Sequence, residues 1–149
     1  MEWAALIAWV VTAAGGFVLL AIWLSRGGMK QASEAGSRIR PPLILSHFLL
    51  AAIGLVIWII YVATDSDALA WVAFVLLAVV AVLGFTMFAI WFQRRQRGPV
   101  AATGVTGNPG SSETPPEQHF PVPIVGLHGL LAVTTVVLVF LTAVGVGES

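Results

Sequence analysis

Two histidines stand in matching contexts within otherwise apolar stretches of the chain. His47 lies five residues after Pro42, and His128 lies five residues after Pro123; each histidine is followed, one residue later, by Leu-Leu-Ala. Imidazole binds metal ions through a ring nitrogen, and an ionisable side chain is expensive to place in an apolar environment. The pair is therefore the candidate functional centre of this sequence.

A second set of matches lies upstream of each histidine. Gly16-Phe17 and Ala21-Ile22-Trp23 recur 68 positions later as Gly84-Phe85 and Ala89-Ile90-Trp91, whereas the histidine motif recurs after 81 positions. The two spacings differ by 13 residues, which we assign to a longer connection in the second half. The pattern indicates a duplicated pair of segments.

The composition is that of a membrane protein. Of the 149 residues, 58% are hydrophobic and 9% are charged, and the mean hydropathy is +0.96, which lies far from the composition of soluble domains. The sequence contains no cysteine. Thiolate zinc sites, iron–sulfur clusters and covalently attached c-type haem are therefore excluded.

Four stretches contain no Asp, Glu, Lys or Arg: residues 3–25, 41–64, 68–93 and 120–147. Each exceeds the roughly 20 residues that a helix needs to cross a bilayer core. We expect an all-α integral membrane protein, a four-transmembrane-helix bundle built from two tandem two-helix repeats, residues 1–64 and 65–149. The first stretch lacks a basic leader, so we expect it to be retained rather than cleaved as a signal peptide.

All basic residues lie in two connections, 26–40 and 94–119. By the positive-inside rule both connections are cytoplasmic, and both termini lie outside. Residues 98–118 are polar and lack apolar periodicity, so they are predicted to be a mobile loop. Abundant Ala, Val and Gly with little Lys indicate a bacterial inner (plasma) membrane protein.

The first and third segments run in the same direction, so the repeats are parallel and related by a pseudo-twofold axis along the membrane normal. Equivalent residues then face each other if they point inward. Each histidine lies about 7.5 Å beyond its entry proline, which puts both at one level in the cytoplasmic half. Two facing imidazoles are suited to bind haem iron axially. The hypothesis is one haem b held by His47 and His128.

Residues around the pair add to this hypothesis. One turn beyond each histidine stands alanine, Ala51 or Ala132, which leaves room either for a flat cofactor or for close helix packing. Trp23 and Trp91 occupy equivalent positions near the cytoplasmic end, where they are candidates for the walls of a cofactor site or for interfacial anchors.

Three cationic or ionisable residues are candidate partners of the haem propionates: Arg38, Arg40 and His119. Arginine binds carboxylates as a planar fork. The two arginines also serve as topogenic charges by their position, and His119 also fits a plain surface residue.

With its four helices and its histidine pair, the chain resembles the small b-type membrane cytochromes, including the cytochrome b561-like and bacterial di-haem groups. The cytochrome b561-like arrangement uses four membrane histidines for two haems, whereas this sequence offers two. What the resemblance implies is one haem that exchanges electrons with a cytoplasmic partner, a quinone or another membrane subunit.

Other functions stay open. The histidines could serve only as interhelical hydrogen-bond donors in a structural or anchor subunit, and another metal, a proton relay or a small transporter are further alternatives. No hydrolytic or transferase site is visible in the sequence, and no basic domain supports nucleic-acid binding. The lipid bilayer is the one partner that the composition itself predicts.

Overall fold

The computed structural model describes residues 1–31, 39–96 and 116–146. These residues form four long helices, α1 (Glu2–Ser25), α3 (Pro41–Thr64), α4 (Asp67–Gln96) and α5 (Val122–Ala143). Two short elements complete them, the helix α2 (Gly28–Gln31) and the 3-10 helix η1 (Pro116–His119). The described chain is therefore all-helical.

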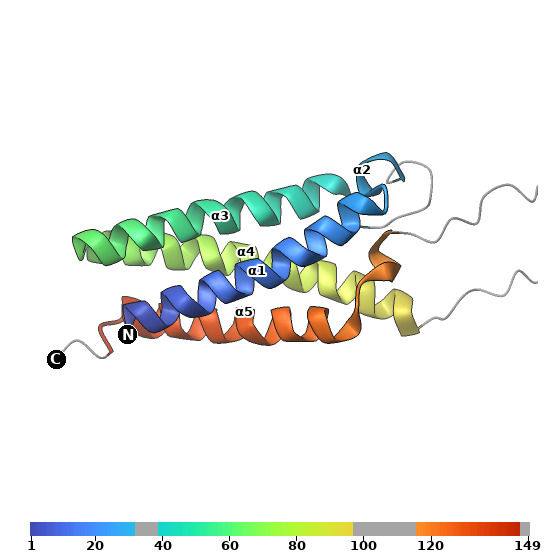
Figure 1. Cartoon of the computed structure of the whole chain (residues 1–149). Helices are drawn as coiled ribbons and strands as arrows, with labels where there is room; N and C mark the ends of the chain where they lie inside the picture. Colours follow the sequence, from blue (N-terminus) through green and yellow to red (C-terminus); the bar gives the residue numbers. More distant parts are fainter. Residues whose placement is uncertain (32–38, 97–115, 147–149) are drawn as a thin grey trace, which may run out of the picture.

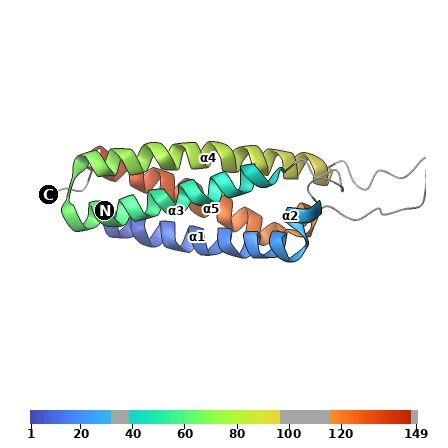
Figure 2. The ribbon, with the colours of Figure 1, turned by 90° about the horizontal axis from the view of Figure 1, so that it is seen from above.

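The four long helices lie side by side as an antiparallel bundle (Figure 1). α1 packs against α3 and α5, and α4 packs against the same two helices. The most extensive contacts join α3 to α4 and α1 to α5. Both termini lie at one end of the bundle, while α2 and η1 lie at the other end (Figure 2).

All four long helices are long and apolar enough to span a membrane, which indicates a multi-pass membrane protein. Only 11 to 22% of the residues in their most apolar stretches are buried inside the bundle. Most large apolar side chains therefore point outward, the arrangement expected where lipid rather than water surrounds a protein.

The helix boundaries follow from local chemistry. Proline occupies the first turns of α3 and α5, where a missing N–H costs little. α3 ends at Thr64 and is capped by Asp65, which has the left-handed φ of 54° that Asp tolerates better than most residues. α5 ends at Ala143, before Gly145 with a φ of 78°, which is earlier than the uncharged stretch 120–147 predicted.

α4 extends to Gln96, beyond the predicted boundary at residue 93. The absence of charge marks the part of a helix that suits a hydrocarbon core, and it does not mark the helix end. Arg94 and Arg95 continue the helix in its last turn, where positive charge is favoured by the helix dipole.

The main hydrophobic core lies in the half of the bundle that carries the termini. Trp9 of α1 packs against Trp58 of α3 with ring centroids 6.3 Å apart, and Trp58 packs against Tyr61 at 4.7 Å. The indole N–H of Trp58 donates to the backbone carbonyl of Glu2 at 3.3 Å. Small residues such as Ala5 and Ala73, both fully buried, let the helices approach around these large rings.

A second buried group closes the opposite end. Trp23 is 1% exposed and lies against Gly28 at the start of α2, where any Cβ would overlap the indole ring. Gly27 makes the turn between the two helices with a φ of 78°, a conformation that suits glycine. The buried residues Ile39 and Pro116 belong to the same end of the bundle.

The buried positions repeat at the spacings found in the sequence. The buried residues Ala5, Trp9, Thr12 and Trp23 of α1 have buried counterparts 68 positions later in α4, namely Ala73, Leu77, Val80 and Trp91. The buried residues Gly54, Trp58 and Tyr61 of α3 have buried counterparts 81 positions later in α5, namely Thr135, Val139 and Thr142. Equivalent helices thus turn equivalent faces to the interior.

Candidate functional site

The structure brings together the two histidines of the long apolar helices. His47 on α3 and His128 on α5 are 81 positions apart in the sequence, yet their ring centroids lie 6.4 Å apart with ring planes inclined at 67°. Both side chains are half-buried. The two rings lie next to each other within the bundle in an edge-to-face arrangement.

Each ring is held by a hydrogen bond to the main chain of a neighbouring helix. His47 Nδ1 lies 3.0 Å from the carbonyl oxygen of Val80 on α4, and His128 Nδ1 lies 3.0 Å from the carbonyl oxygen of Thr12 on α1. A carbonyl oxygen can only accept, so Nδ1 carries the hydrogen and donates in both cases. In the neutral imidazole, Nε2 is then an unprotonated nitrogen with a free lone pair.

The two acceptors are themselves equivalent positions. Val80 follows Thr12 by 68 residues, the spacing that also separates the glycine and tryptophan matches. A histidine from one half of the chain therefore bonds to the first helix of the other half, in the same way on both sides. The two imidazoles are therefore held by the same type of hydrogen bond to equivalent backbone positions.

Two glycines provide the close approach that this geometry needs. A Cβ atom built on Gly16 would lie 3.0 Å from Cε1 of His128, and one on Gly84 would lie 3.1 Å from Cε1 of His47. Both distances are tighter than ordinary contact, so a side chain there would displace the ring. Gly16 and Gly84 belong to the sequence matches, and their function is to admit the imidazole edges.

The donor set fits a haem better than a bare metal ion. Among the described residues no group of three or more His, Cys, Asp or Glu side chains is placed to hold a metal. A protein zinc site takes three or four side-chain ligands, whereas haem iron needs at most two because the porphyrin supplies the rest. Two neighbouring histidines are too few for such a zinc site but are enough for haem iron.

The ring separation can be compared with that of two imidazoles bound to one metal. A metal lies about 2 Å from a ligating imidazole nitrogen, and that nitrogen lies about 1 Å from the ring centre, so two imidazoles on one metal have centroids about 6 Å apart. The observed 6.4 Å is of this size. A ligating histidine also usually donates its other N–H to a carbonyl or carboxylate, as both histidines do here.

The small residues beyond the histidines lie where the sequence places them. Ala51 and Ala132 are half-buried, one turn from His47 and His128. Two turns from each histidine, Gly54 and Thr135 are buried. The interior stripe below each ring is therefore small in both halves.

Trp23 and Trp91 lie further along their helices from the imidazole rings than the two glycines do. Both are buried, at 1% and 6% exposure, but each stands seven residues beyond the glycine that contacts an imidazole, which is about 10 Å along the helix. Arg95 lies over the ring of Trp91 at 5.4 Å. Along their helices the two tryptophans therefore lie about two turns nearer to the α2 and η1 end than the two glycines do.

Two of the three candidate propionate partners belong to the described residues. Arg40 is exposed at the N-cap of α3, and His119 is exposed at the end of η1. Arg38 lies outside the described residues. The hypothesis that these three residues hold carboxylates stays a prediction.

An ion pair in this region was missed by sequence reasoning. Arg94 Nη1 lies 3.4 Å from Oε1 of Glu117, whose side chain is 1% exposed. Most of the predicted loop 98–118 lies outside the described residues, but its end is different from that prediction: Pro116 and Glu117 are buried in η1. A single carboxylate within a polar stretch gives no sequence signal of burial.

Comparison with protein-family models, curated proteins and solved structures finds no match to this chain. The function must therefore be argued from the geometry of its own residues.

Proposed function

We propose that this protein is a membrane-embedded b-type haem protein for electron transfer or redox sensing, in which His47 and His128 would hold the haem. The observation that carries the proposal is the matched pair of Nδ1–H bonds to Thr12 and Val80, which leaves both Nε2 atoms free in rings 6.4 Å apart. A bound haem supplies a one-electron couple.

The residues of the chain have defined tasks in this proposal. The two carbonyl acceptors hold each imidazole in the tautomer that can ligate through Nε2 and keep its orientation fixed. Gly16 and Gly84 let the rings lie against α1 and α4. The apolar helix surfaces around the pair exclude water, which lowers the local dielectric constant and so affects the reduction potential of a bound centre.

We also propose that the bundle is a tandem duplication, two parallel repeats related by a pseudo-twofold axis along the membrane normal. The support is the recurrence of buried positions at the two sequence spacings and the equivalence of Thr12 and Val80. An axis of this kind would put both histidines at one depth, where a single cofactor can engage both.

The proposed orientation places the α2 and η1 end in the cytoplasm of a bacterial cell and both termini outside. Arg26 follows α1, Arg40 precedes α3, and Arg94 and Arg95 lie in the last turn of α4. These helix ends lie on the α2 and η1 side of the bundle (Figure 1), as the positive-inside rule requires of the cytoplasmic side. The histidine pair then lies in the cytoplasmic half, where its redox partner would be a cytoplasmic protein, a quinone or a second membrane subunit.

A structural role is the second candidate, because each histidine already has a satisfied hydrogen bond. Interhelical bonds of this type contribute about 1 kcal/mol within membranes. A non-catalytic anchor subunit would need nothing more from the pair. The two candidates differ in whether Nε2 binds iron.

The test is the visible absorption spectrum of the full chain, expressed with haem available, purified in detergent and measured before and after dithionite. A Soret band with a sharp reduced α-band supports a bis-histidine b haem. A colourless protein that stays helical by circular dichroism and takes up no added haemin overturns the proposal and leaves the structural role.

A further inference from the structure

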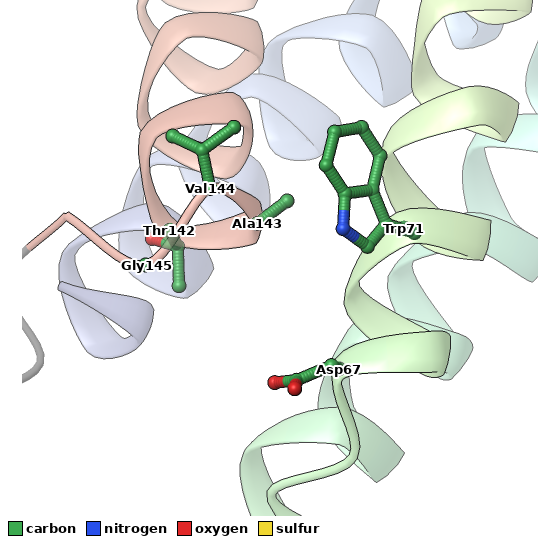
Figure 3. A pocket seen from close by; sticks show the side chains of 6 residues that line it. All are labelled: Asp67, Trp71, Thr142, Ala143, Val144 and Gly145. Atoms are coloured by element: carbon green, nitrogen blue, oxygen red, sulfur yellow. The ribbon is translucent and has the colours of Figure 1, made fainter.

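A recess of about 270 Å³ lies at the end of the bundle that carries both termini, away from the histidine pair. It is formed between the start of α4 and the end of α5, and six residues line it: Asp67, Trp71, Thr142, Ala143, Val144 and Gly145 (Figure 3). Its volume is slightly below the range typical of drug-sized ligand sites, so it suits a small group.

Two of the lining side chains can only accept hydrogen bonds. Asp67 presents a carboxylate, which when ionised has no hydrogen to donate. Thr142 is 4% exposed, and its hydroxyl already donates to the carbonyl oxygen of Leu138 at 2.9 Å. Because a hydroxyl has one hydrogen, the Thr142 oxygen can offer only its lone pairs to a further partner.

The third polar group is a donor. The indole nitrogen of Trp71 faces the recess in Figure 3, and no residue in the described ranges accepts a hydrogen bond from it. A ligand that forms hydrogen bonds with all three polar groups therefore needs donors for Asp67 and Thr142 and an acceptor for Trp71. The ring of Trp71 also offers a face to a cation.

The local charge selects a cation. Every Lys and Arg of the sequence lies between positions 26 and 97, and the described ones, such as Arg26, Arg40 and Arg94, belong to the helix ends on the α2 and η1 side. The N-terminal ammonium of Met1 is paired with Glu2 at 3.1 Å. The Asp67 carboxylate is a full negative charge, and the C-terminal end of α5 adds the negative end of its helix dipole. The start of α4 opposes these with about half a positive charge, which leaves the recess net negative.

We infer that this recess binds an organic ammonium group that carries a neighbouring phosphate oxygen, as in the head group of a zwitterionic phospholipid. A primary ammonium has three donors for the carboxylate and hydroxyl oxygens, and the phosphate oxygen accepts from Trp71. Trp71 stands near the end of an apolar helix, at the depth where interfacial tryptophans meet lipid head groups. The apolar side chains of Ala143 and Val144 line the remaining wall.

The experiment measures the thermal midpoint of unfolding, Tm, of the full chain in detergent during titration with short-chain phosphatidylethanolamine. A ligand that binds only the folded state raises Tm with its concentration. Short-chain phosphatidylglycerol, which lacks the ammonium, is the lipid control, and soluble phosphoethanolamine distinguishes a lipid head group from a free amine as the source.

Two variants lower the affinity if the inference is right. Asp67→Asn removes the charge and Trp71→Phe removes the N–H, and each should weaken the apparent affinity at least tenfold. The matched controls are Asp65→Asn, which removes a carboxylate two residues away outside the recess, and Trp3→Phe, which changes an exposed tryptophan of the same end. Both control variants should show the same rise of Tm with phosphatidylethanolamine as the natural sequence.

A Tm rise with phosphatidylethanolamine that Asp67→Asn abolishes and Asp65→Asn preserves supports the inference. Equal affinity for soluble phosphoethanolamine also supports the ammonium site, with a free amine as its source. An equal rise with phosphatidylglycerol, an unchanged titration in Asp67→Asn, or no rise with any of the three ligands overturns it.

Discussion

The imidazole rings of His47 and His128 lie 6.4 Å apart, and each donates its Nδ1–H to the carbonyl of a residue at an equivalent position of the other half. The pair is thus oriented by backbone atoms, which cannot be removed by substitution of a side chain. The histidines themselves are the sensitive positions. Four predictions follow from this relation and from the ion pair at the C-terminal end of α4.

Replacement of either histidine distinguishes a role in haem binding from a role in helix packing. In His47→Ala or His128→Ala, a haem-binding protein loses one axial ligand, so the sharp reduced α-band of the low-spin form should disappear or give way to a high-spin spectrum. The lost interhelical bond costs only about 1 kcal/mol, so both variants should stay folded. Visible absorption and circular dichroism on the same samples check both statements.

His119→Ala is the matched control, because His119 is the third histidine of the sequence and is exposed. It should keep the spectrum of the natural sequence. If all three alanine variants bind equal haem with the same spectrum, the histidine pair is not the ligand set.

The glycines beside the rings should resist substitution. Gly16→Ala places a methyl group 3.0 Å from Cε1 of His128, and Gly84→Ala places one 3.1 Å from Cε1 of His47. Overpacking of this type typically costs about 1–3 kcal/mol. We expect a lower free energy of unfolding and weaker haemin binding in both variants, measured by denaturant titration in detergent and by absorption at the Soret band.

Gly126→Ala and Gly129→Ala provide the comparison. A Cβ atom at either position has no heavy atom within 4 Å among the described residues. These two exposed positions of α5 should accept alanine without loss of stability or of haemin binding. Equal losses at all four glycines would contradict the close approach of the rings.

The sequence was sufficient to predict the four long helices, and it put the two histidines at equivalent positions of two of them. Four uncharged stretches gave the four long helices, and Pro42 and Pro123 gave their entry points, because hydrocarbon excludes charge and because proline is tolerated in a first helical turn. The matched spacing also indicated that His47 and His128 share one level.

The hydrogen-bond acceptors of the two imidazole rings could not be predicted from the sequence. The acceptors for the two histidines are backbone carbonyls of Thr12 and Val80, and every residue has a carbonyl, so the side-chain types carry no signal for them. Glu117 was missed for a related reason. Its burial depends on a tertiary contact with Arg94 and not on local hydropathy, and the surrounding polar segment predicts exposure.

The side chain of Thr12 should matter less than its carbonyl. Its hydroxyl lies 3.1 Å from that of Thr135, but each hydroxyl also donates to a carbonyl of its own helix. Each has one hydrogen, so the contact between them competes with those bonds. Val80 occupies the equivalent position and still accepts from His47 through its backbone.

We therefore expect Thr12→Val to keep the haem spectrum and to cost about 0.6 kcal/mol, the average for hydrogen-bonded side chains within membranes. The spectrum and an unfolding titration in detergent measure the two quantities. Loss of the low-spin spectrum in Thr12→Val would show that the hydroxyl, rather than the carbonyl, orients His128.

The ion pair between Arg94 and Glu117 should couple the end of α4 to η1. Glu117 is fully buried, and Arg94 Nη1 lies 3.4 Å from its carboxylate oxygen. Removing one member of a buried pair leaves the other partly desolvated, which costs more than the pair itself contributes. Glu117→Gln and Arg94→Gln should each destabilise the bundle, and the double variant should be less destabilised than the sum of the two.

A double-mutant cycle in unfolding free energy measures this coupling, which we expect to be about 1–3 kcal/mol, the upper part of the range for residues in contact. Arg95 is the matched control because it neighbours Arg94 in α4 but lies over the ring of Trp91. The cycle between Arg95→Gln and Glu117→Gln should give a coupling close to zero. Additive effects of Arg94→Gln and Glu117→Gln would mean that Arg94 does not hold the Glu117 carboxylate in place.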